Sequence, residues 1–227
     1  MISKKNLTLF TIAALVINVA SLFLPDFYIT QIIRLISSIT YFFLLYKLAN
    51  KNKYILVYFI LTIITDALDF YYSTPLIISV FTIVKILAYL SIALLLLNKI
   101  SFKKVSASIK LLFFLVVLIN ILIGYQTVSS LVMEDSFIVG IIIFLFWVIS
   151  IFTASFAAIY YFNLERRSSF LIPFVFAFVF SDLSAFVAGY EYIYVFYFLE
   201  KVLYLLSFYF LGRFLLNRKE LAKRANR

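Results

Sequence analysis

The chain has 227 residues, 66% of them hydrophobic and only 13% charged, with a mean hydropathy of +1.12 and a net charge of +10. A soluble domain of this length exposes far more polar surface, so the composition predicts an integral membrane protein built from helices. Cysteine and histidine are absent, which excludes disulfide frameworks, thiol nucleophiles, imidazole bases and the usual zinc or haem ligands. We expect neither a metal nor another cofactor. The positive charge is distributed as a membrane protein needs for its orientation, so we expect no nucleic-acid partner.

Eight apolar segments are long enough to cross a bilayer with a hydrocarbon core of ~30 Å. They lie at about residues 7–24, 28–48, 54–72, 76–97, 111–126, 137–162, 170–189 and 192–216. A cleaved signal peptide is the competing interpretation of the first segment, but that segment has full spanning length and more spans follow it. The sequence thus predicts an all-α protein with eight transmembrane helices, forming a single transmembrane domain over residues 1–227.

Basic residues alternate between the predicted loops. All of them except Arg34, Lys85 and Lys201 lie at the N-terminus, in or beside the segments after spans two, four and six, or in the C-terminal tail. The loops after spans one, three, five and seven hold none, and the loop at Glu134-Asp135 is acidic. This alternation places both termini in the cytoplasm, and we expect the protein in a bacterial inner (plasma) membrane.

One stretch of the chain occurs twice. Residues 65–91 read TDALDFYYSTPLIISVFTIVKILAYLS and residues 181–207 read SDLSAFVAGYEYIYVFYFLEKVLYLLS. A single offset of 116 residues pairs Asp66 with Asp182 and Lys85 with Lys201. With four spans in each half, both halves enter the membrane in the same direction. The sequence therefore predicts two parallel four-helix repeats, about residues 1–102 and 103–227, related by an axis along the membrane normal.

Several ionisable side chains fall inside the predicted spans, where an unpaired charge is costly. They are Arg34, Asp66, Asp69, Lys85, Asp182, Glu200 and Lys201. Their opposite signs nearly cancel, as low dielectric requires, and their positions along the spans place them at similar depths. We expect them to converge on one polar site, with Tyr197 and Tyr204 beside the last two. The alternatives are that the pairs only hold helices together, or that Arg34 extends to the interface.

These features resemble the YhhN-like lysoplasmalogenase family, whose members have eight spans with both termini inside. The resemblance rests on Thr65-Asp66 in span three and on Ser181-Asp182-Leu183-Ser184-Ala185 in span seven. The predicted topology resembles that of the family over most of the chain, whereas the specific residues that match are few. The chain departs from the family where Thr65 replaces a Gly, where Ile86 rather than Pro follows Lys85, and where Leu199-Glu200-Lys201 replaces an Ala-Gln after Tyr197.

The resemblance implies a membrane lipid substrate, because members of that family hydrolyse the vinyl ether of lysoplasmalogens to a fatty aldehyde and a glycerophospho-alcohol. It further implies that Asp66 and Asp182 are the catalytic carboxylates, one donating a proton and the other orienting water. Lys85 and Lys201 would tune these acids or bind a phosphate headgroup. The supporting positions are expected to be Glu200, Asp69, Arg34, Tyr197 and Tyr204.

Two other functions use the same buried charges. A small-molecule or proton-coupled transporter also places Asp and Lys inside a bundle, although spans three and seven lack the Gly/Pro pairs that break carrier helices. A photoreceptor would use Lys201 as a Schiff-base lysine, but eight spans and the equivalent Lys85 argue against it. All three functions leave the oligomeric state open.

The predicted topology can be tested with single cysteines, because the chain has none of its own. Cysteines introduced at Ser73 and at Ser101 are expected to react with a membrane-impermeant thiol reagent from opposite sides of the membrane. Labelling of both positions from the same side would contradict the predicted orientation.

Overall fold

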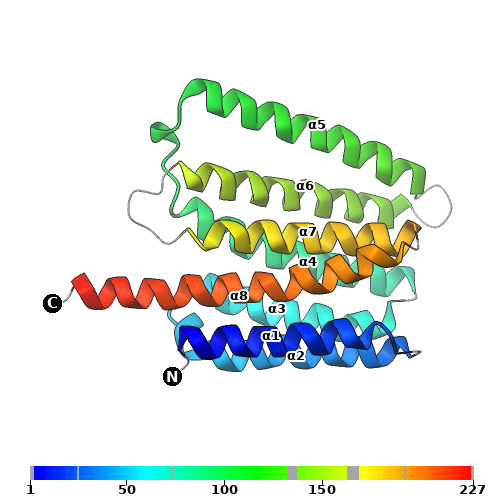
Figure 1. Ribbon diagram of the computed structural model, residues 1–227. Helices are drawn as coiled ribbons and strands as arrows, with labels where there is room; N and C mark the ends of the chain where they lie inside the picture. The colour runs from blue at the N-terminus through cyan, green and yellow to red at the C-terminus, as the bar shows by residue number, and fades with distance from the viewer. Residues whose placement is uncertain are drawn as a thin grey trace. The chain divides into compact units, whose positions relative to one another are not determined.

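The computed structural model of the protein describes residues 3–24, 26–72, 74–131, 137–162, 169–191 and 193–225. Within these ranges the regular elements are eight α-helices and two short 3₁₀ turns (Figure 1). The helices are α1 (Lys4–Ser21), α2 (Phe27–Ala49), α3 (Lys53–Leu68), α4 (Pro75–Leu97), α5 (Ala107–Leu131), α6 (Phe137–Tyr161), α7 (Leu171–Glu191) and α8 (Tyr194–Ala225). The acidic Glu134-Asp135 segment, the Glu165-Arg166-Arg167 segment and Ser73 lie outside the described residues.

Seven of the described helices, α2 to α8, are long and apolar enough to cross a membrane. Such a set of helices identifies an all-helical integral membrane protein. Helix α1 is not in this set, since it begins with Lys4, Lys5 and Asn6 and carries Asn18 in its last turn. An eighth span at α1 stays a prediction.

Capping residues set the starts of three helices. The Ser3 hydroxyl accepts a hydrogen bond from the backbone N–H of Asn6 (3.1 Å), and the Asp26 carboxylate accepts one from Tyr28 (2.9 Å). Thr74 caps α4, whose first residue is Pro75. These side chains satisfy backbone N–H groups that have no partner within the helix, and proline suits a first helical position.

Helix α8 is longer than the expected last span. That span was expected to end near residue 216, with a basic tail beyond it, whereas the helix continues to Ala225. The added residues are mainly Lys, Arg, Glu, Leu and Ala, which favour helix, and basic residues are stabilised at a helix C-terminus.

The helices group into two compact units. The first unit contains α1, α2, α7 and α8, and the second contains α3, α4, α5 and α6. Each unit draws two helices from each of the halves predicted at about residues 1–102 and 103–227. The predicted parallel repeat and its axis stay predictions.

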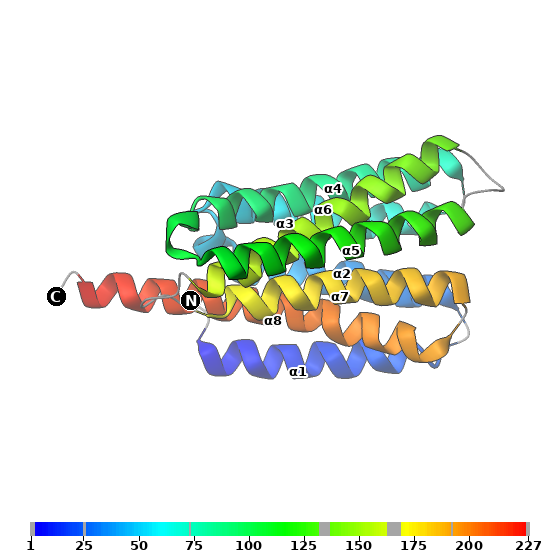
Figure 2. The ribbon, with the colours of Figure 1, turned by 90° about the horizontal axis from the view of Figure 1, so that it is seen from above.

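Helix α8 is central to the first unit, because it contacts α1, α2 and α7. Figure 2 shows α8 beside α1 and α7. A Cβ atom added at Gly212 would lie 2.7 Å from Leu7 Cδ2 and 3.3 Å from both methyl groups of Leu45, so the glycine lets three helices approach closely. One turn earlier, Phe208 stacks on Tyr41 of α2 with ring centroids 5.0 Å apart.

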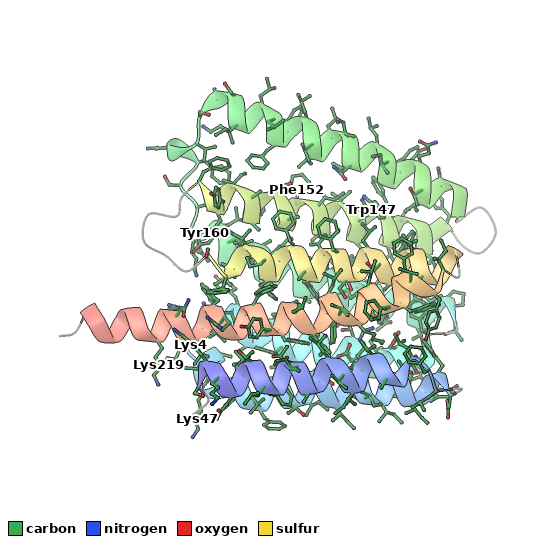
Figure 3. The ribbon with its side chains drawn as sticks, in the orientation of Figure 1. Lys4, Lys47, Trp147, Phe152, Tyr160 and Lys219 are labelled. Carbon is green, nitrogen blue, oxygen red and sulfur yellow. The ribbon has the colours of Figure 1, made fainter. Side chains whose placement is uncertain are left out.

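Helix α6 has the corresponding place in the second unit, where it contacts α4 and α5. Its Trp147 (Figure 3) donates a hydrogen bond from Nε1 to the carbonyl oxygen of Asn120 on α5 (3.2 Å). The indole covers Gly124, where an added Cβ would lie 2.4 Å from Trp147 Cδ1. On the α4 side, Tyr89 and Phe146 pack edge to face with centroids 5.6 Å apart.

Gly124→Ala should therefore disturb the α5–α6 contact. A methyl group at this position forces the indole to move and lengthens its hydrogen bond, and overpacking of this kind costs about 1–3 kcal/mol. The unfolding free energy and the emission of Trp147, the single tryptophan of the chain, would both report the change.

Gly189→Ala is the matched control, because no heavy atom of the described residues lies within 4 Å of a Cβ added there. Both substitutions gain the same helix propensity, so the difference between the two variants isolates the clash. Equal stability and unchanged tryptophan emission in the two variants would contradict the packing described for α5 and α6.

Candidate functional site: a buried charge cluster in the first unit

Helix α2 has the reverse of the usual pattern for a helix of a soluble protein. On its outer surface lie three isoleucines, Ile29, Ile32 and Ile36, whose side chains are 38%, 45% and 57% exposed. The buried residues in the part of α2 from Thr30 to Tyr41 all carry a polar group. They are Thr30, Gln31, Arg34, Ser37, Ser38 and Tyr41. Apolar side chains suit a lipid-facing surface, and polar side chains need partners inside the bundle. The pattern marks the interior of the first unit as a polar site.

An ion cluster lies at the centre of this polar face. Arg34 Nη1 is 2.8 Å from Glu200 Oε1 of α8, and Glu200 Oε2 is 3.3 Å from Lys201 Nζ. The side chains of all three residues are at most 9% exposed. The guanidinium carbon of Arg34 also lies 4.4 Å from the ring centroid of Tyr204, one turn further along α8. Arg34 is thus directed into the unit rather than toward the interface.

The cluster is energetically demanding. Removing charges from water costs several kcal/mol per ion, and the mutual attraction offsets this only where geometry is good. Here one carboxylate contacts two cations through different oxygens, and an aromatic face covers the guanidinium, which adds a cation–π attraction. Losing the carboxylate would leave two buried cations facing each other. Glu200 is therefore the member on which the cluster depends.

Helix α7 brings a second carboxylate to the same part of the unit. The Ser181 hydroxyl donates a hydrogen bond to the backbone carbonyl of Glu200 (3.1 Å), which joins α7 to α8 beside the cluster. The next residue is Asp182, which is 5% exposed, and Ser184 is also buried. Two acidic residues, Asp182 and Glu200, therefore lie on a pair of packed helices inside a unit of membrane helices.

Hydrogen bonds continue the polar region between α1 and α2. Asn18 Nδ2 donates to the hydroxyl of Ser37 (2.9 Å), and the Tyr41 hydroxyl donates to Thr11 Oγ1 (2.7 Å). The Asn18 side chain is fully buried, and its Oδ1 accepts no hydrogen bond from the described residues. That oxygen is an acceptor suited to a hydroxyl or water donor, since a buried acceptor left without a donor costs free energy.

The second unit holds two further predicted site residues. Asp66 on α3 is 1% exposed and follows two buried threonines, Thr62 and Thr65, whose hydroxyls bond to the backbone of their own helix. Lys85 on α4 is 8% exposed, and its ammonium lies 4.9 Å from the ring centroid of Phe81 and 5.9 Å from that of Phe146. Both ionisable side chains are thus buried, as residues of a polar site inside membrane helices must be.

The remaining predicted residues are less enclosed. Asp69 is half-buried in a 3₁₀ turn, Asp69–Tyr71, that follows α3, and Tyr197 is half-buried on the first turn of α8. Asp182 belongs to the first unit and Asp66 to the second. Their convergence on one site stays a prediction.

Sequence reasoning missed the polar face of α2 and the hydroxyl of Ser181. The polar face of α2 could have been found from the sequence. Its polar residues from Thr30 to Tyr41 recur three or four positions apart, as residues on one helix face do. The role of Ser181 depends on the packing of α7 against α8, which no local pattern reveals.

Among the described residues, no group of three or more acidic side chains could hold a metal ion. Comparisons with family models, curated proteins and solved structures gave no match for the chain. The function is therefore inferred from the residues of the site.

Glu200→Gln is expected to destabilise the first unit by about 3–5 kcal/mol, because it leaves the buried guanidinium and ammonium groups without a counter-charge. Asn18→Ala removes a neutral hydrogen bond between helices, and such bonds in membrane proteins contribute about 0.6 kcal/mol and at most ~1.7 kcal/mol. Unfolding free energies of the purified variants measure both effects.

Asp26→Asn is the control for loss of a carboxylate. Asp26 is exposed and caps α2, and asparagine caps a helix about as well as aspartate, so little change is expected. If Glu200→Gln cost no more than Asn18→Ala, the ion cluster would not be the stabilising centre of this unit.

Proposed function

We propose that the protein is an integral membrane hydrolase that cleaves the vinyl ether of a lysoplasmalogen. The observation that carries the proposal is the placement of Asp182 on the helix that packs beside the Arg34–Glu200–Lys201 cluster, inside a unit of membrane helices. The sequence resemblance to lysoplasmalogenases supports the same reaction. The proposal does not require a cofactor.

Holding the helices together does not by itself explain why the first unit buries these ions. Neutral hydrogen bonds such as Asn18–Ser37 and Thr30–Ser21 already join α1 to α2. Ion clusters buried in membrane helices are costly and usually serve a substrate, ion or proton. A unit that buries both Asp182 and Glu200 has the acidic groups that acid–base chemistry needs.

The reaction needs a proton on carbon and then a water molecule. A carboxylic acid donates its proton to the vinyl carbon remote from the ether oxygen, which forms an oxocarbenium ion. Water adds to the cationic carbon while a carboxylate accepts one of its protons, and this gives a hemiacetal. The hemiacetal breaks its bond to the glycerol oxygen, which takes up a proton, so the products are an aldehyde and an alcohol. One water is consumed, and neither an oxidant nor a reductant is needed.

The first unit supplies groups for these steps. We assign proton donation to Asp182, since a carboxylic acid in a dry site is a suitable donor. The second carboxylate is Asp66 by the sequence resemblance, or Glu200 by the contacts within the first unit. Among the described residues the Lys201 ammonium forms an ion pair with Glu200, and its other N–H groups are donors for the phosphate of the substrate. Asn18 Oδ1 is an acceptor for a glycerol hydroxyl.

Release of fatty aldehyde from a lysoplasmalogen by the purified protein in detergent tests the proposal. Asp182→Asn is expected to lower the turnover number by ~10²–10⁴, because asparagine keeps the shape but cannot transfer the proton. Asp66→Asn should have a similar effect if Asp66 is the second carboxylate, and little effect if Glu200 has that role.

Asp69→Asn and Asp26→Asn are the matched controls, since one residue is half-buried and the other exposed. Asp26→Asn should keep near-normal turnover, and the loss in Asp69→Asn should be much milder than in Asp182→Asn. The ester-linked lysophospholipid of the same headgroup should remain intact, because an ester lacks the carbon that accepts the proton. Near-normal turnover in both the Asp66 and Asp182 variants would end the hydrolase proposal and leave transport or helix association as the role of the buried charges.

A further inference from the structure

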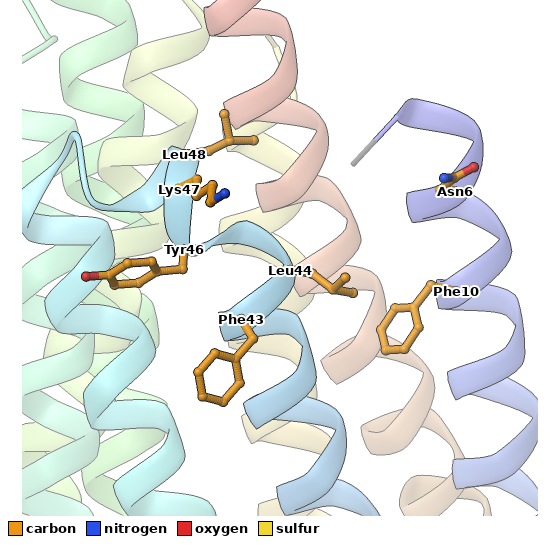
Figure 4. Close-up of a pocket in the computed structure, with 7 residues that line it drawn as sticks. All are labelled: Asn6, Phe10, Phe43, Leu44, Tyr46, Lys47 and Leu48. Atoms are coloured by element: carbon orange, nitrogen blue, oxygen red, sulfur yellow. The ribbon is translucent and has the colours of Figure 1, made fainter. Parts of the chain in front are cut away.

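A groove lies between α1 and α2 at the opposite end of the first unit from the charge cluster. Its volume is about 650 Å³. Figure 4 shows its wall on α1, formed by Asn6 and Phe10, and its wall on α2, which includes Phe43, Leu44 and Lys47. Figure 3 shows Lys4, Lys47 and Lys219 at this end of the first unit, which we call the basic end.

The groove changes from polar to apolar along the helices. Asn6 and Lys47 lie toward the basic end, and Phe10 and Phe43 lie one helical turn further from it (Figure 4). One turn corresponds to a depth of ~5.4 Å. Such a gradient matches a phospholipid, whose charged headgroup lies at the membrane surface and whose acyl chains lie deeper. A soluble metabolite has no acyl chain to place against Phe10 and Phe43.

The charge of the groove selects the class of lipid. Lys47 is exposed and forms no ion pair within the part of the chain that the structure describes. Lys4 and Lys219 lie at the same end of the first unit (Figure 3), so the basic end carries an excess of positive charge. A phosphate without a compensating choline is attracted by this charge, and basic pockets between membrane helices on the cytoplasmic side bind anionic headgroups.

We propose that this groove binds one anionic phospholipid from the leaflet at the basic end of the first unit. The phosphate contacts the Lys47 ammonium and the Asn6 amide, and an acyl chain lies along Phe10 and Phe43. The lipid joins α1 to α2. It is not the hydrolase substrate, because Lys47 is ~20 Å along α2 from Arg34 of the charge cluster.

Native mass spectrometry of the purified protein measures this binding, with phosphatidylglycerol and phosphatidylcholine of identical chains as the two probes. The wild-type protein is expected to bind phosphatidylglycerol more tightly. Lys47→Gln should weaken phosphatidylglycerol binding ~5-fold, the effect of one lysine near a membrane surface. Lys51→Gln is the matched control, since it removes the same charge from an exposed position outside the groove.

Asn6→Asp separates binding from folding. A carboxylate in the first turn of α1 favours the helix, whereas its charge repels a phosphate in the groove. This variant should be at least as stable as the wild type and should bind phosphatidylglycerol more weakly. Equal binding of the two lipids by the wild type, or equal losses in the Lys47 and Lys51 variants, would overturn the proposal. Neither result bears on the hydrolase, because no substrate is present.

Discussion

The ion pair between Arg34 and Glu200 is the interaction on which the first unit depends. It joins α2 to α8, the helix that also contacts α1 and α7. Inside membrane helices such a pair cannot exchange its partners for water, so the surrounding packing has to keep the geometry intact. The Tyr204 ring beneath the guanidinium and the hydroxyl of Ser181 at the Glu200 carbonyl fulfil that requirement.

The first unit divides into two parts with different properties. Toward the starts of α2 and α8, hydrogen bonds and ions occupy the interior, and these are the groups that a proton transfer can use. Toward the basic end, Leu7 and Leu45 pack against Gly212, and a groove is lined by residues of α1 and α2. The division separates a proposed reaction site from a proposed lipid site, so a change at one end need not affect the other.

Much of the fold could be predicted from the sequence, because long apolar segments leave few alternatives in a bilayer. The buried positions of Asp66, Asp182, Lys85 and Lys201 follow from the same reasoning. Which charges pair could not be predicted. Arg34 and Glu200 are far apart in the sequence and meet only because α2 packs on α8. The repeat draws attention to Asp182 and Lys201, whereas the observed partner of Lys201 is its neighbour Glu200.

A double-mutant cycle of Arg34→Met and Glu200→Gln tests most directly whether this ion pair organises the first unit. Glu200→Gln leaves two buried cations without a counter-charge, Arg34→Met leaves Glu200 paired with Lys201 alone, and the double variant removes both members of the ion pair. We predict that the loss of unfolding free energy in the double variant is smaller than the sum of the single losses by at least ~1 kcal/mol. Losses that add to within about 0.5 kcal/mol would show that the two side chains act independently, and would contradict the account.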